Sequence, residues 1–296
     1  METRKNNLFI SDILSRSFNL CKDNFIEIIK AIAVFLLPVT IIQNIIDKDK
    51  VVTFDFSDKF YKVAINQDPY YLEKIINNID FGGIAMLILV GFIISIVSFF
   101  GYLVIMKIVD YGDKNEDVSW ISAIKYVWKK KWSLLGLNIL FYIMLIAGTI
   151  AFTILSIMIA LITLGIGLIL IIPLWIFVFL VIIPSTYLFN STMLVRDLGV
   201  IDSIRETFLL FRRGYFWSTI GKLSAISGIV FGLAIVMGIL SLIPVIGEII
   251  GIIGGYAIAI YLIAYINVFV LDRNKPNIDS FGGDNNSGEN LIDPII

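Results

Sequence analysis

Residues 133–191 read SLLGLNILFYIMLIAGTIAFTILSIMIALITLGIGLILIIPLWIFVFLVIIPSTYLFNS and include no charged residue. A single α-helix crosses the apolar part of a bilayer with about 20 residues, so this run is too long for one crossing. Two glycines, Gly165 and Gly167, lie close together near its middle. We therefore expect the chain to fold back there and to form a hairpin of two membrane-spanning helices.

The whole chain has the composition of a membrane protein. Of its 296 residues, 58% are hydrophobic and 16% are charged, whereas soluble domains have about 45–50% and about 25%. Six stretches are long and apolar enough to cross a bilayer, namely 26–46, 82–109, 133–160, 166–191, 216–243 and 247–270. The sequence predicts an all-α polytopic membrane helix bundle with six transmembrane helices, and it disfavours a soluble protein with large buried helices.

Residue types that the chain lacks limit its chemistry. It has no His, which excludes His-ligated zinc or haem and a Ser-His catalytic triad. Cys21 is the only cysteine, so no intramolecular disulfide can form. The net charge of −1 creates no field that would attract nucleic acid. We find no catalytic constellation, metal-ligand set or phosphate-binding glycine loop, and we expect no enzymatic activity, no cofactor and no nucleic-acid partner.

A pattern of basic and aromatic residues occurs three times, each time just before a long apolar run. The copies read Cys21-Lys-Asp-Asn-Phe25, Trp128-Lys-Lys-Lys-Trp132 and Phe211-Arg-Arg-Gly-Tyr215. When they are aligned without gaps, Lys22, Lys129 and Arg212 coincide, and an aromatic residue lies three positions after each of them. The pattern predicts three parallel repeats at about 8–109, 117–191 and 200–270, each an interfacial amphipathic helix followed by a helical hairpin.

Ahead of each basic cluster, apolar residues recur at helical spacing with polar and basic residues on the opposite face, which is typical of a helix in the headgroup layer. In the third copy, Ser203-Ile-Arg-Glu206 is a capping box that predicts a helix start near Ser203. We define the collar as Lys22, Phe25, Trp128, Lys129, Lys130, Lys131, Trp132, Arg212, Arg213, Tyr215 and Trp217. Two interpretations stay open: the collar recognises anionic phospholipid headgroups, or it only caps the bundle and sets its orientation.

The distribution of basic residues predicts the orientation, because Lys and Arg are enriched in the cytoplasmic loops of membrane proteins. Six spans place both termini and the two loops between hairpins on one side, together with 18 of the 23 basic residues. The other five are Lys48, Lys50, Lys59, Lys62 and Lys74, which all lie in the outer loop 47–81. We expect both termini to be cytoplasmic.

Residues 1–272 are predicted to form a single membrane domain. Its second, fourth and sixth spans end with similar residues, Val109-Asp110, Val195-Arg196-Asp197 and Val270-Leu271-Asp272. The outer loop 47–81 is polar and rich in aromatic residues, and it either plugs the bundle or binds a partner. The tail 273–296 is rich in Asn, Asp, Gly and Ser, and we expect it to be disordered and cytoplasmic.

Few polar side chains fall within the predicted spans. Lys30, Lys107 and Lys222 lie near the cytoplasmic boundary, where they can snorkel to water. The remaining candidate intramembrane polar residues are Asn138, Asn190, Glu248 and Asn267. We interpret the asparagines as hydrogen-bonding partners between helices. Glu248 lies at the outer end of the last hairpin, and we interpret it as an interfacial loop residue rather than a proton or ion site.

Glycines at four-residue spacing mark two helix faces in the last hairpin. One face carries Gly228 and Gly232, and the other carries Gly247, Gly251 and Gly255. Small residues at this spacing let helices approach closely. We expect these glycines to pack helices together, either within the bundle or between subunits of a homo-oligomer or a membrane complex.

The opening segment, Ile10-Ser-Asp-Ile-Leu-Ser-Arg-Ser-Phe-Asn-Leu-Cys-Lys-Asp-Asn-Phe25, resembles a group of poorly characterised bacterial multi-spanning proteins. That group is similar to the membrane domain found N-terminal to some glycerophosphodiester phosphodiesterases. Its late motif resembles Ile201-Asp-Ser-Ile-Arg-Glu206 leading to Phe211-Arg-Arg-Gly-Tyr-Phe-Trp217. The resemblance covers roughly 8–272 through loose motifs and implies a lipid-facing module of the bacterial inner membrane. The chain carries no phosphodiesterase domain, so no catalytic residue can be carried over.

The leading functional hypothesis is a non-enzymatic structural or accessory subunit, associated with membrane lipid or with an envelope complex. The first alternative is a transporter or permease subunit, which parallel repeats favour and the scarcity of buried charge disfavours. The second alternative is a membrane enzyme with its site in loop 47–81.

Overall fold

The computed structural model describes residues 8–48, 81–116, 118–163, 165–212, 215–243 and 246–273. Within these ranges the chain forms helices and short turns and no strand, so the predicted all-α class is confirmed. The predicted outer loop, apart from residues 47, 48 and 81, and the predicted tail beyond Arg273 lie outside the described residues.

Short helices alternate with long apolar ones along the chain. The short helices are α1 (Ile10–Asp23), α7 (Trp120–Lys129) and α10 (Val200–Leu209). The long ones are α2, η1 and α3 in one run (Phe25–Ala31, Ile32–Leu36, Leu37–Lys48), α6 (Phe81–Asp113), α8 (Lys131–Ile162), α9 (Leu168–Val195), α11 (Phe216–Leu240) and α12 (Ile246–Asp272). Six segments of the described chain are long and apolar enough to cross a membrane, as predicted, with mean hydropathies between 2.2 and 2.6.

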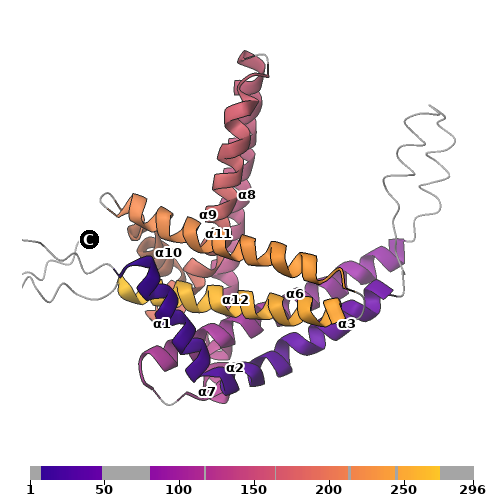
Figure 1. Ribbon diagram of the computed structural model, residues 1–296, viewed down its shortest axis with the longest axis vertical. Coiled ribbons are helices and arrows are strands. Elements are labelled where there is room, and N and C mark those ends of the chain that lie inside the picture. Colours follow the sequence, from indigo (N-terminus) through magenta and orange to yellow (C-terminus); the bar gives the residue numbers. More distant parts are fainter. Residues whose placement is uncertain are drawn as a thin grey trace, which may run out of the picture.

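The helical hairpins meet at a common end of the molecule, which we call the base. From the base, α8 and α9 project together to one side, whereas α3, α6, α11 and α12 run in another direction (Figure 1). The short helices α1, α7 and α10 lie around the base (Figure 1). Away from the base, α8 and α9 pack on each other through contacts such as that of Phe152 with Trp175, whose ring centroids are 4.6 Å apart.

The packed core lies at the base and is built from the C-terminal ends of three long helices. Residues 103–110 of α6, 188–195 of α9 and 262–270 of α12 are all buried. Large apolar side chains farther from the base are exposed, as Phe231 and Ile162 show. Apolar surface in water is unfavourable by about 25 cal/mol per Å², and lipid removes that penalty. The distribution of exposed and buried residues is therefore the one that a multi-pass membrane protein requires.

Helices α6 and α9 end through the same local geometry. Asn115 and Asp197 have positive φ angles of 54° and 55°, a left-handed conformation that Asn and Asp adopt more readily than most residues. One residue later, the amides of Glu116 and Leu198 each donate to the carbonyl five residues earlier, at 3.0 and 3.1 Å. This hydrogen bond is typical of a Schellman motif, which stops a helix and redirects the chain.

The predicted capping box in the third copy is wrong. α10 begins three residues earlier than predicted, with an extended Gly199 as its N-cap. Ser203 is buried within the helix and donates to the Gly199 carbonyl at 2.6 Å, while Glu206 forms an ion pair with Arg196. The left-handed turn at Asp197 redirects the chain so soon after α9 that the next helix starts before the capping residues are reached.

The first span contains a π-helical turn, η1, where α6 crosses it closely. A Cβ atom at Gly101 of α6 would lie 2.7 Å from the Cβ of Phe35, so a larger residue would force the two helices apart. The carbonyl of Leu36, at the end of the π turn, accepts a hydrogen bond from the hydroxyl of Tyr256 at 2.9 Å. The π turn thus joins α6 and α12 to the first span.

Three of the predicted packing glycines lie against no other helix among the described residues. A Cβ atom at Gly228, Gly232 or Gly255 would meet no atom of the described residues within 4 Å. The described residues therefore give no support to packing within the bundle at these three positions. Their packing between subunits stays a prediction.

The other two glycines lie against the end of α11. A Cβ atom at Gly247 would lie 2.6 Å from the Ser241 carbonyl oxygen, and one at Gly251 would lie 3.5 Å from the Ser241 Cβ. Gly254, outside the predicted face, makes the close helix contact instead, since its Cβ would lie 2.5 Å from the sulfur of Met237. α12 therefore turns Gly254, rather than the Gly255 of the four-residue pattern, toward Met237 of α11.

Candidate functional site at the base of the hairpins

The collar residues lie where each short helix meets the following span. The residue before each span is Asn24, Lys130 or Tyr215, with φ between −111° and −96° and ψ between −11° and 16°. These residues lie two, one and three positions after the aligned basic residues. The junctions therefore share a backbone conformation without sharing a strict register.

The aromatic residues of the collar are exposed, with relative exposures of 46 to 78% for Phe25, Trp128, Trp132, Tyr215 and Trp217. The aligned basic residues, Lys22, Lys129 and Arg212, are also exposed and form no ion pair within the described part of the chain. Arg213 lies outside the described residues. The base thus carries exposed aromatic rings together with basic side chains that are free to meet an external anion.

The consecutive lysines of the second copy have different surroundings. Lys130 forms an ion pair with Asp197. Lys131 instead lies beside two collar aromatics, its Nζ atom 4.0 Å from the ring centroid of Trp128 and 5.9 Å from that of Trp132. Lys130 is therefore a structural residue, and Lys131 keeps a charge that no carboxylate of the described residues balances.

Asp110 is the centre of a buried charged cluster. Its fully buried carboxylate lies 2.7 Å from the Nζ of Lys107 and 2.9 Å from the Nζ of Lys114. The same two ammonium groups donate to the carbonyls of Leu194 and Val195, at 3.4 and 3.0 Å. These carbonyls end α9, where the helix dipole favours positive charge. The predicted snorkelling of Lys107 is wrong, because its partners lie inside the protein.

Tyr126 connects this cluster to the collar. Its ring centroid lies 4.2 Å from the Nζ of Lys107, and its hydroxyl donates to Asp197. Burial and the neighbouring Asp197 raise the pKa of Tyr126, while hydrogen bonds from Lys130 and Tyr126 lower the pKa of Asp197. Asp197 stays ionised at neutral pH, so these contacts hold α7 to the end of α9 and are lost only as the pH falls through its lowered pKa.

Asp272 has a similar place at the end of α12. It is buried and accepts hydrogen bonds from the backbone amide of Leu8, which begins the described chain, at 3.3 Å. The Nζ of Lys222 lies 3.7 Å from Asp272 and has no hydrogen-bond partner among the described residues. Lys222 is buried, so its predicted snorkelling is also wrong. The adjacent Arg273 donates to Ser218 at 2.9 Å, and burial lowers its pKa.

The three acidic residues that recur at the span ends therefore join separate parts of the chain. Asp110 positions two lysines on the end of α9, Asp197 binds the second basic cluster, and Asp272 holds the segment before α1. The sequence shows their recurrence, and Lys107 and Lys114 lie within four residues of Asp110. The partners of Asp197 and Asp272 are distant in sequence and carry no local signal.

The candidate asparagines lie between helices. Asn138 of α8 and Asn190 of α9 donate to each other's side-chain oxygens at 2.8 and 3.1 Å. Asn267 of α12 accepts a hydrogen bond from Ser191 and donates to the Met106 carbonyl at 2.7 Å, so it joins three helices. The side chain of Glu248 lies outside the described structure.

Two further contacts of the base have no signal in the sequence. Glu27 accepts a hydrogen bond from the backbone amide of Trp120 at 3.0 Å and pairs with the exposed Lys30. A carboxylate at this position is favourable because Trp120 begins α7. Arg16 of α1 pairs with Asp113 at 2.6 Å. The bonded residues are 93 and 97 positions apart, so no motif could reveal either contact.

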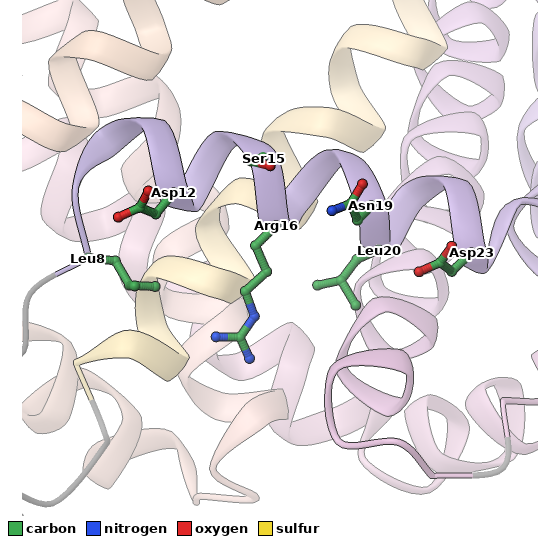
Figure 2. A pocket seen from close by; sticks show the side chains of 7 residues that line it. All are labelled: Leu8, Asp12, Ser15, Arg16, Asn19, Leu20 and Asp23. Carbon is green, nitrogen blue, oxygen red and sulfur yellow. The ribbon is translucent and has the colours of Figure 1, made fainter.

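A shallow depression of about 420 Å³ lies beside α1 (Figure 2). Its lining residues are Leu8, Asp12, Ser15, Arg16, Asn19, Leu20 and Asp23. Arg16 is already paired with Asp113, and Asp12 lies at the opposite end of the depression from Asp23 (Figure 2). No three Asp, Glu or Cys side chains of the described residues are placed to hold a metal ion. The depression therefore brings no acid and base together for catalysis.

The chain matches no protein-family model, no curated protein and no solved structure. The resemblance to the membrane domain of glycerophosphodiester phosphodiesterases stays a prediction.

Proposed function

We propose that the chain is a non-enzymatic six-span protein of the bacterial inner membrane, which binds anionic phospholipid headgroups through its collar and serves as a structural or accessory subunit of a membrane or envelope complex. The observation that carries this proposal is a division of charge at the base. The buried acids pair with interior lysines, whereas Lys22, Lys129 and Arg212 stay exposed beside exposed aromatic rings. Exposed basic and aromatic side chains suit the headgroup layer of an anionic membrane.

The base lies on the cytoplasmic side in this proposal, because the collar is basic and the inner leaflet carries anionic lipid. The three units are repeats, which the shared junction conformation and the similar ends of α6 and α9 support. Hairpins that all cross one flat bilayer have roughly parallel axes.

In Figure 1 the α8–α9 hairpin diverges from the hairpin of α11 and α12. Six crossings therefore require the α8–α9 hairpin to turn about its base until it is aligned with the other hairpins.

The collar proposal predicts a loss of anionic lipid when its exposed charges are removed. The test variant combines Lys22→Gln, Lys129→Gln and Arg212→Gln, three residues without an ion-pair partner in the described chain. Each basic residue near an anionic surface contributes about 1 kcal/mol, so the anionic fraction of lipid that co-purifies in mild detergent should fall several-fold.

The matched control exchanges Lys and Arg at the same three positions and keeps every charge. It should retain the wild-type lipid composition. Topology is checked in parallel, since the collar also sets orientation. An unchanged anionic fraction in the glutamine variant, with topology intact, would leave the collar as an orientation signal only.

A transporter or permease subunit is the second candidate, and the buried pair of Lys107 and Asp110 favours it. Ionisable residues inside a membrane often mark ion pathways. Transporter sites, however, lie near the bilayer midplane, whereas this pair lies at the base. An adjacent ATPase gene would favour the transporter, and adjacent lipid-metabolism genes would favour the accessory subunit.

A further inference from the structure

An apolar groove of about 330 Å³ opens at the second copy of the collar, between η1, α6, α7 and the first turns of α8. Its lining includes the buried Val104 and Val127 and the partly exposed Phe35, Val97 and Phe100. Grooves that hold small ligands have volumes of about 300–1,000 Å³ and mainly apolar walls. This groove has the size and lining to take an alkyl chain.

Among the described residues that line the groove, Lys131 is the only charged one. Its ammonium group lies beside the rings of Trp128 and Trp132, which also line the groove. Aromatic rings attract a cation but do not neutralise it. No carboxylate of the described residues pairs with Lys131, so one positive charge at this apolar groove has no counter-ion within the described structure.

An apolar groove with a single unbalanced cation is complementary to an amphiphile with a negative head. The first turns of α8 place Lys131 at the collar, and the groove extends from there along α6 toward Val97. The exposed Trp128 and Trp132 supply the interfacial rings that accompany a headgroup. A protein segment would bury the same apolar walls but would need an acidic residue beside Lys131.

We propose that this groove binds one anionic phospholipid, with an acyl chain against Val97 and Phe100 and its phosphate at Lys131. The inference rests on the proposed association of the collar with anionic lipid and assigns it a specific site. It distinguishes Lys131, which holds a bound lipid, from Lys130, which pairs with Asp197, and from Lys129, which lies exposed on the surface.

The test is native mass spectrometry of the full chain after detergent washing and addition of phosphatidylglycerol or phosphatidylcholine. The wild type should retain one phosphatidylglycerol in preference to phosphatidylcholine. Lys131→Gln should lower that retention about fivefold, the factor that corresponds to about 1 kcal/mol for one basic residue. Val97→Phe, which fills the groove and leaves every charge in place, should lower it as well.

Three variants control for charge and fold. Lys131→Arg keeps the charge and should retain the lipid. Lys125→Gln removes a charge from the exposed face of α7 and should not change lipid retention. Val236→Phe adds the same bulk as Val97→Phe at an exposed position of α11 and should not change it either. Unchanged single-lipid retention in both Lys131→Gln and Val97→Phe would overturn the groove while leaving the collar proposal intact. A wild type without preference for phosphatidylglycerol would overturn both, and a dimer that Val97→Phe abolishes would assign the groove to a second copy of the chain instead.

Discussion

Asp110→Asn should lower the free energy of unfolding by about 3–5 kcal/mol, because removing one partner of a buried ion pair leaves the other charge uncompensated. Lys107 is the residue left behind, with its side chain only 6% exposed. The same change weakens the attachment of α6 to the end of α9, since Lys107 and Lys114 reach the α9 carbonyls from positions next to Asp110. Unfolding of the detergent-solubilised protein measures the effect.

The matched control is Asp202→Asn, which changes an exposed carboxylate in the first turn of α10. It should cost about 1 kcal/mol or less. The double variant Lys107→Met with Asp110→Leu should recover most of the lost stability, because apolar residues of similar volume often replace a buried ion pair without loss. Lys114, which also loses its partner, is 32% exposed and can be hydrated. Equal stability of Asp110→Asn and Asp202→Asn would contradict the buried cluster.

Phe269→Ala should also lower the free energy of unfolding by about 3–5 kcal/mol, as expected when a large aromatic side chain is removed from a packed core. Phe269 is fully buried at the base end of α12. Its ring centroid lies 5.8 Å from the Nζ of Lys222 and 5.7 Å from the guanidinium of Arg273. The substitution therefore also removes an aromatic face from two cations.

Phe231→Ala in the same hairpin is the control, because that ring is 61% exposed in the protein and lies in the lipid-facing part of α11. Its effect on unfolding in detergent should stay within about 0.5 kcal/mol, as for most exposed substitutions. Equal losses in the free energy of unfolding for Phe269→Ala and Phe231→Ala would show that the core does not lie at the base.

The helix content and the six long apolar helices could be predicted because they depend on local composition. An uncharged stretch of membrane length identifies a span whatever surrounds it. The position of the core could not be predicted, because all six spans are apolar along most of their length. Which end of each helix is buried depends on how the hairpins meet. The recurring Asp110, Asp197 and Asp272 lie at that end, but their recurrence does not show that it is buried.

Predictions that depended on helix rotation or on neighbouring elements were less successful. Lys107 looked like a snorkelling residue because its burial depends on α9, where it meets the Leu194 carbonyl 87 positions away. Its pairing with Asp110, three residues later, does not by itself show that the pair is buried. The capping residues Ser203 and Glu206 fit a helix start by spacing alone, but the turn at Asp197 starts the helix earlier. The glycine pattern gave the spacing of a packing face, and the crossing of α11 and α12 selected Gly254 instead of Gly255.

The position of the collar was predicted, but the different surroundings of its residues were not. Lys129, Lys130 and Lys131 look alike in the sequence, whereas the fold leaves the first exposed, pairs the second with Asp197 and places the third at an apolar groove. Side chains that follow one another on a helix point in different directions. Their partners then depend on which elements the fold brings to each side.

Cysteine accessibility in intact spheroplasts tests most directly whether the chain crosses the membrane six times with its base in the cytoplasm. The background is Cys21→Ser, which removes a thiol whose pKa burial raises to about 11. Single cysteines are then placed at exposed positions, Ile166 and Leu242 in the turns far from the base and Lys125 and Arg205 on the short helices of the base. A membrane-impermeant maleimide should label the cysteines at positions 166 and 242 in intact spheroplasts, and those at 125 and 205 only after permeabilisation. Labelling of position 125 or 205 from outside would contradict a cytoplasmic base. Labelling of positions 166 and 242 from opposite sides would contradict six crossings.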